Sequence, residues 1–167
     1  PQGGRLTLDG IAMRALTVRL QDEIFAIEAG SVREILDLVP ITEVPNAPSF
    51  VGGLINVRGR VVPLADLRVV FDMARPEPDE DTRIVVLEVE IDGEPTIAGI
   101  LADKVHDVTD IDAVLIQDAP RVGMRWRPEF VSGVARRDGG FVIIPNLNRI
   151  FSVQGSRSMP PAEERAA

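Results

Sequence analysis

An arginine and a glutamate have the clearest capacity for a specific interaction in this sequence. Arg58 stands in Asn56-Val57-Arg58-Gly59, which is typical of a tight turn between two strands, because glycine accepts the positive φ that such a turn needs. A guanidinium at a hairpin tip can donate two parallel hydrogen bonds to one carboxylate. Glu34 lies just before this hairpin and is the natural partner. The residues alone allow either a specific Glu34–Arg58 contact or an ordinary surface ion pair worth about 0–1 kcal/mol.

Two other groups of residues could bind a metal ion, and both are better explained without one. His106 is the single histidine, with Asp107 and Asp110 nearby, and could be a general base or a ligand. One histidine without cysteine is a poor ligand set, so we expect His106 on an exposed strand. The acidic run Glu77–Asp81 lacks the glycine-centred spacing of a calcium loop and contains Pro78, which indicates a solvated loop.

Motifs for phosphate binding and nucleophilic catalysis are absent from the sequence, which contains neither G-x-x-x-x-G-K-[ST] nor G-x-S-x-G. Three arginines surround Trp126, at Arg121, Arg125 and Arg127, and could form a cation–π or nucleic-acid patch. The formal net charge of −8 instead favours a basic loop with one anchoring aromatic residue. It also argues against a nucleic acid as partner.

Composition limits the class of protein further. The 167 residues suit one domain or two small lobes, and 45% of them are apolar but only 4% aromatic. A core of Val, Ile and Leu favours strands. The absence of cysteine excludes disulfides and thiolate metal sites and fits a reducing cytoplasm. No apolar run approaches the ~20 residues that span a bilayer, so no direct membrane insertion is expected.

The sequence contains an internal repeat, since residues 48–71 align without a gap to residues 128–151. A weaker echo relates the segment that starts at Ile27 to the segment that starts at Ile100. Two copies are too few for a solenoid and predict two similar subdomains around a pseudo-twofold axis. The matched pairs are Pro48/Pro128, Phe50/Phe130, Val51/Val131, Gly53/Gly133, Gly59/Gly139, Val62/Val142, Leu67/Leu147 and Phe71/Phe151.

Short strands with a turn about every ten residues predict small β-barrels. Alternating apolar residues indicate hairpins, and a short helical piece follows a hairpin in each copy, with Asp66 or Asn146 at its N-cap. Ser31–Leu38 fits either a helical turn or a strand. The Pro-rich, acidic segment Arg75–Arg83 marks the border between the copies. The predicted strands are Met13–Leu20, Glu23–Ala29, Gly53–Arg58, Arg60–Leu64, Arg83–Ile91, Thr96–Ala102, Phe130–Arg137 and Gly140–Ile144, and the helical pieces are Asp66–Phe71 and Asn146–Phe151.

These motifs together resemble the CheW-like family of bacterial chemotaxis coupling proteins. The resemblance rests on Val32-Arg33-Glu34-Ile35, a Pro-rich link at Pro45–Pro48, and the pattern G-x-x-N-x-R-G-x-x-x-P-x-x-D-L that runs from Gly53 to Leu67. It covers roughly Ala15 to Phe151. The second copy keeps the glycine and leucine of this pattern but lacks counterparts of Asn56, Arg58 and Pro63. This difference is expected if only one half of the chain carries a functional site.

The resemblance implies a mainly β fold of two intertwined five-stranded SH3-like β-barrels with short helical pieces. A single CheW-like domain would span residues 13–151. Its first barrel would cover approximately 24–75 and its second approximately 83–151, with exchange of terminal strands possible. Residues 1–12 would be an N-terminal extension and 152–167 a mobile tail.

The resemblance also implies a non-enzymatic adaptor, without cofactor or metal, that couples chemoreceptors to the histidine kinase CheA. Its partners would be the receptor's cytoplasmic tip, held in the groove between the barrels, and the regulatory domain of CheA. It would be cytoplasmic and recruited to receptor arrays. The family motif carries receptor binding over to Val32, Glu34, Asn56, Arg58 and Gly59. Gly53, Gly99, Gly133 and Gly139 would be required by turns or close strands, and no kinase-contact residue is assigned.

Three alternatives stay open from the sequence. The same module occurs within CheA and CheV, and the absence of kinase or receiver sequence here favours a free-standing adaptor. A small-ligand-binding β-barrel would need convergent polar groups in a cavity, which a Val/Ile/Leu core offers sparingly. Nucleic-acid binding is the weakest alternative, given a pI near 4.7.

Overall fold

The computed structural model describes residues 6–7, 10–45, 50–120, 127–137 and 139–158, and strands dominate these ranges. The strands are β1 (Leu6–Thr7), β2 (Gly10–Leu20), β3 (Glu23–Glu28), β4 (Val32–Asp37), β5 (Thr42–Glu43), β6 (Val51–Val57), β7 (Arg60–Ala65), β8 (Arg83–Ile91), β9 (Glu94–Ala102), β10 (Lys104–Asp112), β11 (Ile116–Gln117), β12 (Val131–Arg137) and β13 (Gly140–Pro145). The helices are α1 (Leu67–Val70) and α2 (Leu147–Ser158), with short 3-10 turns η1 (Ala29–Ser31), η2 (Ala113–Leu115) and η3 (Pro128–Phe130).

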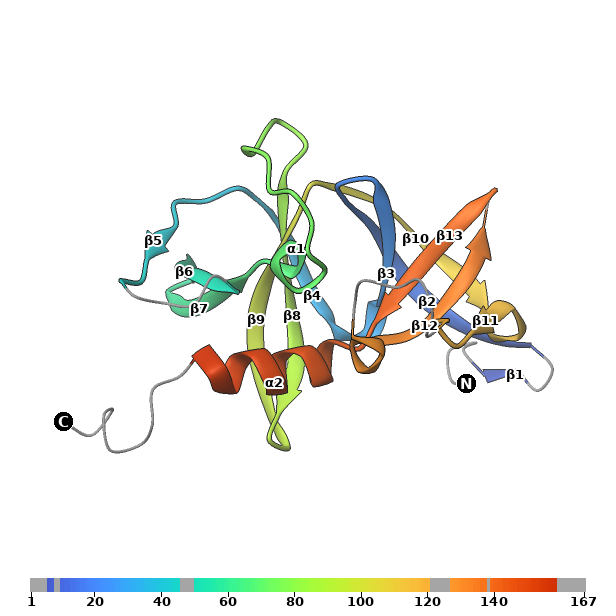
Figure 1. Cartoon of the computed structure of the whole chain (residues 1–167). Helices are drawn as coiled ribbons and strands as arrows, with labels where there is room; N and C mark the ends of the chain where they lie inside the picture. The colour runs from blue at the N-terminus through green and yellow to red at the C-terminus, as the bar shows by residue number, and fades with distance from the viewer. Residues whose placement is uncertain (1–5, 8–9, 46–49, 121–126, 138, 159–167) are drawn as a thin grey trace.

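The strands form two sheets that stand next to each other (Figure 1). The first has the order β4-β8-β9-β7-β6-β5, and the second has β10-β2-β3-β13-β12-β11, with β1 added to β2. Each sheet curls into a barrel. The short strand at one edge, β5 or β11, is connected in the chain to the strand at the opposite edge of the same sheet, β4 or β10, so the two edges lie close together. The predicted mainly β fold with SH3-like barrels is confirmed.

The two barrels do not follow the order of the chain. The hairpin β8–β9 comes from the second copy of the repeat, yet it lies between β4 and β7 of the first copy. The hairpin β2–β3 lies in the same way between β10 and β13. The predicted limits of approximately 24–75 and 83–151 differ from this strand pairing, although the exchange of terminal strands that the prediction allowed is seen at β2–β3. Apolar alternation shows that a segment is a half-buried strand but not which barrel it joins.

Buried side chains form three clusters, one in each barrel and one between the barrels. In β8, successive side chains belong to different clusters, because neighbouring side chains point to opposite faces of a strand. Ile84 and Val86 fill the first barrel, whereas Val85 and Leu87 face the central core. That central core also holds the buried aromatic rings of Phe25, Phe50, Phe71, Phe130 and Phe151.

The two copies make matching backbone contacts around this core. The N–H of Asp66 donates to the carbonyl of Phe50 at 2.9 Å, and the N–H of Asn146 donates to that of Phe130 at 2.8 Å. Asp66 and Asn146 also cap the helices that follow, as predicted, since their side chains accept backbone N–H groups of α1 and α2. The internal repeat of the sequence is thus an internal repeat of structure.

Gly53 and Gly133 occupy matching bulges in the pairing of β6 with β7 and of β12 with β13, close to the short strands β5 and β11. A Cβ on Gly53 would lie 2.5 Å from Cγ2 of Ile41 and 2.8 Å from the carbonyl oxygen of Thr42. A Cβ on Gly133 would lie 2.6 Å from Cγ2 of Ile116. Both positions need glycine because the neighbouring chain approaches too closely for a side chain.

The two remaining predicted glycines have different surroundings. Gly99 lies inside the first barrel, where an added Cβ would be 3.2 Å from Cγ2 of Ile84. Gly139 has a φ of +80° in the turn between β12 and β13. The first is required by packing and the second by backbone conformation.

Both ends of the domain differ from the prediction. β2 begins at Gly10 and pairs with β1, so the sheet starts within the predicted N-terminal extension of residues 1–12. The helix α2 continues to Ser158, beyond the predicted end at Phe151, and packs along β8 of the first barrel (Figure 1). The tail prediction for Ser152–Ser158 was wrong, because this stretch prolongs a helix that has a sheet face to pack on. Residues 159–167 lie outside the described residues.

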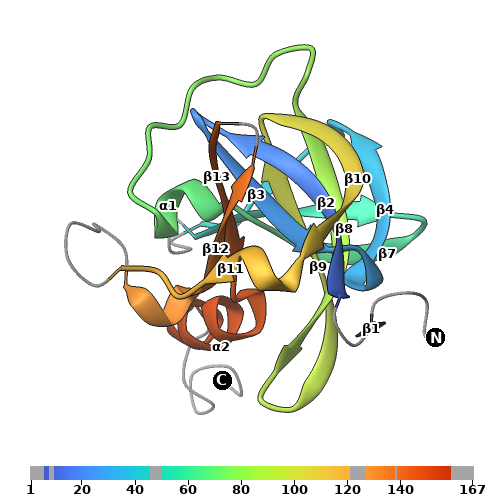
Figure 2. The ribbon, with the colours of Figure 1, turned by 90° about the vertical axis from the view of Figure 1, so that its right-hand side faces the viewer.

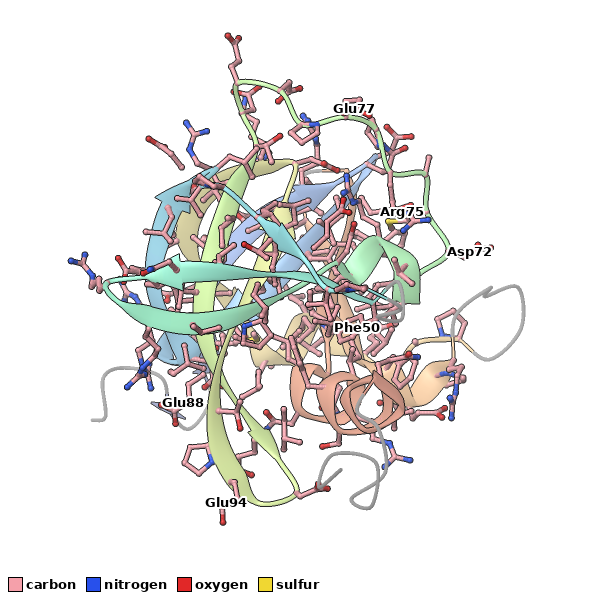
Figure 3. All side chains as sticks on the ribbon, turned by 90° about the vertical axis from the view of Figure 1, so that its left-hand side faces the viewer. Phe50, Asp72, Arg75, Glu77, Glu88 and Glu94 are labelled. Atoms are coloured by element: carbon pink, nitrogen blue, oxygen red, sulfur yellow. The ribbon has the colours of Figure 1, made fainter. Side chains whose placement is uncertain are left out.

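The acidic segment between the copies is a connecting loop, as predicted. It leads from α1 to β8 and carries Arg75 and Glu77 at the edge of the molecule (Figure 3). Its far end is ordered by local bonds, since the hydroxyl of Thr82 accepts from the N–H of Asp79 at 2.9 Å. Thr82 itself is buried, so the loop is anchored just before β8 begins.

Arg68 is a buried charge that joins the two barrels, with only 5% of its side chain exposed. It donates two hydrogen bonds of 2.9 Å to the carboxylate of Asp66 and one of 2.8 Å to Asp103. Asp103 also accepts from the N–H of Gln21 at 2.7 Å, in the turn between β2 and β3. Burial alone would lower the pKa of Arg68, but the two carboxylates outweigh it and hold that pKa above its ordinary value.

We predict that Gly53→Ala lowers the free energy of unfolding by about 1–3 kcal/mol, because Ile41 and the backbone of Thr42 must move to admit the methyl group. Gly52→Ala is the matched control, since an added Cβ there meets no atom within 4 Å. Urea denaturation of both variants checks this. Equal stability of the two variants would contradict the close-approach explanation.

We also predict that Arg68→Met lowers the free energy of unfolding by about 3–5 kcal/mol, because it leaves two carboxylates without their buried partner. Arg75→Met is the control, since Arg75 is exposed on the acidic loop and surface changes usually stay within about 0.5 kcal/mol. The same denaturation measurement applies. A loss for Arg68→Met no greater than that for the control would show that the network does not stabilise the fold.

Candidate partner-binding site

The turn between β6 and β7 holds Arg58 in a fixed position. Arg58 has a φ of +52° and Gly59 a φ of +84°, so both central residues lie in the left-handed region, as in a type I′ turn. The side-chain oxygen of Asn56 accepts from the N–H of Gly59 at 2.8 Å. Because Arg58 is not glycine, its conformation is uncommon, and the Asn56 bond stabilises the turn that imposes it.

Arg58 and Glu34 form the predicted ion pair in bidentate geometry. Nε of Arg58 donates to Oε2 of Glu34 at 3.0 Å, and Nη2 donates to Oε1 at 2.9 Å. Glu34 lies on β4 at one edge of the first sheet, whereas Arg58 lies beyond β8 and β9 at the tip of β6–β7. The pair therefore bridges the mouth of the first barrel and fixes the hairpin tip relative to β4.

The pair is exposed rather than buried. The side chain of Arg58 is 79% exposed and that of Glu34 is 24% exposed. Hydrogen bonds from Arg58 lower the pKa of Glu34 below its ordinary value of 4.5, and Glu34 in turn raises the pKa of Arg58. Both groups stay charged at neutral pH, and the guanidinium remains accessible to a partner.

Apolar side chains lie next to this charged pair. Val61 is 67% exposed and stands opposite Asn56 in the β6–β7 register. Val61 and Asn56 also line a shallow depression of about 370 Å³ with Val39 and Leu54. An exposed valine and partly exposed apolar side chains beside a fixed arginine suit protein contacts. The alternation of Val61 with buried Val62 is the sequence signal that marks Val61 as outward-facing.

The structure gathers four of the five predicted receptor-binding residues at this turn: Glu34, Asn56, Arg58 and Gly59. The fifth, Val32, is on β4 too but is half-buried against the central core. A bulge between Val32 and Glu34 separates them in the pairing with β8. Val32 therefore lies close to Glu34 in the sequence but contributes mainly to packing against the central core.

The weaker candidates of the sequence give no catalytic or metal arrangement in the described part of the chain. His106 is exposed on β10, as predicted. Asp107 accepts from the hydroxyl of Thr17 at 2.9 Å. Within the described ranges, no three acidic or histidine side chains group in a way that could hold a metal ion. Arg121, Arg125 and Trp126 lie outside the described residues.

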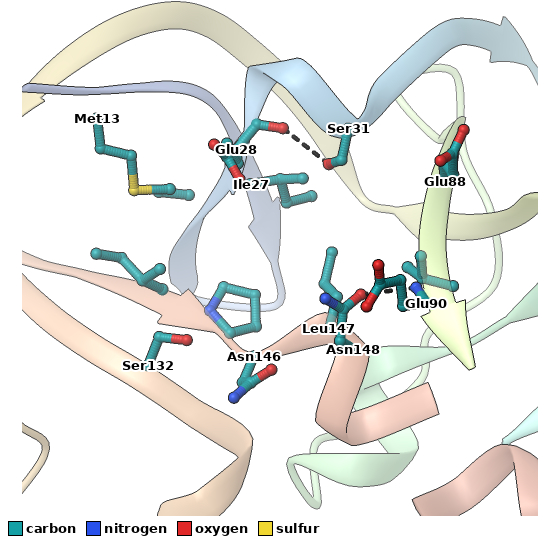
Figure 4. A pocket seen from close by; sticks show the side chains of 14 residues that line it. Met13, Ile27, Glu28, Ser31, Glu88, Glu90, Ser132, Asn146, Leu147 and Asn148 are labelled. Carbon is teal, nitrogen blue, oxygen red and sulfur yellow. Dashed lines mark hydrogen bonds between the residues drawn. The ribbon is translucent and has the colours of Figure 1, made fainter. Parts of the chain in front are cut away.

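A polar pocket of about 520 Å³ lies between the barrels, beside the start of α2 (Figure 4). Three carboxylates line it, from Glu28, Glu88 and Glu90. Glu88 accepts a 2.6 Å hydrogen bond from Arg33, and the N–H of Glu90 donates to the side chain of Asn148 at 2.8 Å. The Glu34–Arg58 pair is not part of this pocket, so the two surfaces are separate features.

A family model described as the CheW-like domain matches residues 14–155. The chain belongs to the CheW-like domain family. The expected resemblance is thereby confirmed over both barrels and most of α2.

Named relatives support the same assignment. The chain is 30% identical over 152 residues to "Chemotaxis protein CheW" of Rhizobium meliloti (strain 1021), covering 91% of this chain and 90% of the relative. It is 29% identical over 148 residues to "Chemotaxis protein CheW" of Klebsiella aerogenes, covering 89% and 87%. The crystal structure of the scaffolding protein TtCheW from Thermoanaerobacter tengcongensis is similar with a TM-score of 0.75 and 31% identity, over 84% of this chain and 88% of that one.

A more distant relative has a different printed name. The chain is 25% identical over 126 residues to "Protein PilI" of Pseudomonas aeruginosa, covering 75% of this chain and 68% of that protein. No helix in the described ranges combines the length and apolar character needed to cross a lipid bilayer.

We predict that an NMR titration finds the pKa of Glu34 below 4.5, and that Arg58→Gln returns it towards that value. Because the folded-state pKa is depressed, the pair stabilises the fold fully above the ordinary pKa and loses this effect as pH falls through the lowered value. Arg60→Gln in the same hairpin is the control and leaves the Glu34 titration unchanged. An identical Glu34 titration in all three proteins would disprove the coupling.

Proposed function

We propose that this chain is a non-enzymatic adaptor that couples chemoreceptors to the histidine kinase CheA in a bacterial chemosensory array. Membership of the CheW-like family supports the adaptor assignment, and its relatives carry the names chemotaxis protein and scaffolding protein. The observation that carries the proposal for this chain is the Glu34–Arg58 pair, which presents an exposed guanidinium beside an apolar surface. Such a surface suits recognition by another protein.

The proposed receptor contact is the turn that carries Arg58. A chemoreceptor's cytoplasmic tip would meet Arg58 and the backbone of Gly59, while Glu34 and Asn56 hold these groups in place. Fixing the guanidinium before binding reduces the side-chain entropy that binding would otherwise cost. Val32 then supports β4 from the core side.

The second partner in this proposal is the regulatory domain of CheA, bound at a surface distinct from the Arg58 turn. Simultaneous contacts raise the effective concentration of receptor and kinase without a tight individual pair. A change in receptor state would alter kinase activity by shifting a population through this linkage. The adaptor would act in the cytoplasm at membrane-associated receptor arrays, without enzymatic chemistry of its own.

Titration calorimetry tests the proposal with a receptor hairpin-tip fragment and, separately, the CheA regulatory domain. We predict that Arg58→Glu weakens receptor-tip binding at least about tenfold, because it places a second carboxylate beside Glu34 and removes the exposed guanidinium. Kinase binding is expected to stay within about twofold.

Arg60→Glu is the matched control for this experiment, since it makes the same charge change on an exposed residue of the same hairpin. It should leave receptor binding nearly unchanged. Wild-type binding to neither partner would overturn the adaptor proposal. Binding to both partners with no effect of Arg58→Glu would keep the adaptor but remove the receptor site from this turn.

A further inference from the structure

The mouth of the second barrel, on the side of the β12–β13 turn, is an open pocket of about 660 Å³. Its lining residues come from β2, β3, β10, β12 and β13, the strands of the second barrel seen together in Figure 2. Its lining includes Thr17, Ile24, Lys104, His106, Arg137 and Phe141. We refer to it as the second-barrel mouth, and it corresponds by the internal repeat to the end of the first barrel that the Glu34–Arg58 pair bridges.

The two mouths differ in what fills them. Thr17 lies on β2 beside the bulge of β10, and the equivalent residue of the first barrel is Val86, which pairs with Glu34 of β4. Arg137 is equivalent to Val57 in the repeat. Val57 and Val86 are only 8% and 2% exposed and pack inside the first barrel. Replacement of two packed valines by Thr17 and Arg137 makes the second mouth polar where the first is apolar.

In the second barrel, other residues stand at the positions equivalent to Glu34 and Arg58. The counterpart of Glu34 is Asp107, which turns to the hydroxyl of Thr17 at 2.9 Å instead of reaching across the mouth. The position equivalent to Arg58 is Asp138, which lies outside the described residues. Asp107 thus lines the pocket as an exposed carboxylate that accepts from Thr17.

The charged side chains that line this mouth are Lys104, Arg137 and Asp107, so the cationic ones outnumber the acidic one. Lys104 is the only lysine and His106 the only histidine in a chain of net charge −8, and both are exposed on β10. On the opposite side, Phe141 is 59% exposed, with the guanidinium of Arg136 5.8 Å from its ring centroid. Lys104 and His106 on β10 therefore lie on another strand than Phe141, whose own hairpin carries Arg136 and Arg137.

We propose that the second-barrel mouth binds an acidic segment of a partner protein, with carboxylates towards Lys104 and Arg137 and an apolar side chain against Phe141. A peptide fits better than a small anion, because Lys104 on β10 and Phe141 on β13 lie on different strands of the pocket lining and one extended segment can contact both. Long-range attraction between a basic patch and an acidic segment favours fast association. This site is separate from the Arg58 turn and does not rest on the proposed receptor contact.

An NMR titration of the full-length chain tests the proposal. The probe is a capped pentapeptide with one leucine between two pairs of glutamates, and the controls are its glutamine analogue and free glutamate. We expect saturable shifts at the His106 ring and at the amides of residues 104–107 and 140–142. The glutamine analogue and free glutamate should each bind at least about tenfold more weakly.

Two variants locate the site, and a third is a matched control. Lys104→Glu should weaken peptide binding at least about tenfold, and Phe141→Ser about fivefold or more. Arg60→Glu, the same charge change at the mouth of the first barrel, should have no effect. Any one of three results would overturn the proposal. The acidic peptide gives no saturable shifts, the glutamine peptide or free glutamate binds equally well, or the shifts are confined to the first barrel.

Discussion

The exchange of two hairpins between the repeats is the constraint on which the rest of the structure depends. β8–β9 completes the first barrel and β2–β3 completes the second, each through one parallel contact, β7–β9 or β3–β13. Neither copy of the repeat can bury its apolar strand faces alone, because the missing strands belong to the other copy. The central core then has no boundary between copies: the ring of Phe50 from the first copy lies 5.3 Å from that of Phe151 from the second. Arg68 adds a polar link between the same parts of the chain.

This common framework makes the differences between the barrels informative. In both, the bulges and the helix caps match, as Gly53 and Gly133 and Asp66 and Asn146 show. Their mouths are not the same, since one is packed with valines and bridged by Glu34–Arg58, and the other is open beside Lys104 and Phe141. Conserving the framework while changing the mouths gives one small protein two distinct surfaces. That arrangement is what an adaptor with more than one partner needs.

Much of this could be predicted from local patterns, and the misses have physical causes. Most of the longer strands and the helix caps follow from alternation and turn chemistry, which are properties of neighbouring residues, whereas β1, β5, β10 and β11 were not among the predicted strands. The residues alone left the Glu34–Arg58 pair open beside an ordinary surface ion pair, and the family resemblance favoured it. The ambiguous segment Ser31–Leu38 became β4 because β8 offered it a partner. Membership of β8 in one barrel or the other depends on contacts between distant residues, which alternation does not encode. The extension of α2 past Phe151 likewise depends on the surface of β8 that it covers.

We propose that the fixed arginine at the β6–β7 turn is the contact through which this chain would bind a chemoreceptor. The most direct measurement is an amide chemical-shift map of the labelled chain on addition of an unlabelled receptor hairpin-tip fragment. The account predicts that the largest perturbations fall on Glu34 and on residues 56–59, with adjacent effects at Val61. Perturbations confined to the second barrel, or to the polar pocket between the barrels, would contradict it.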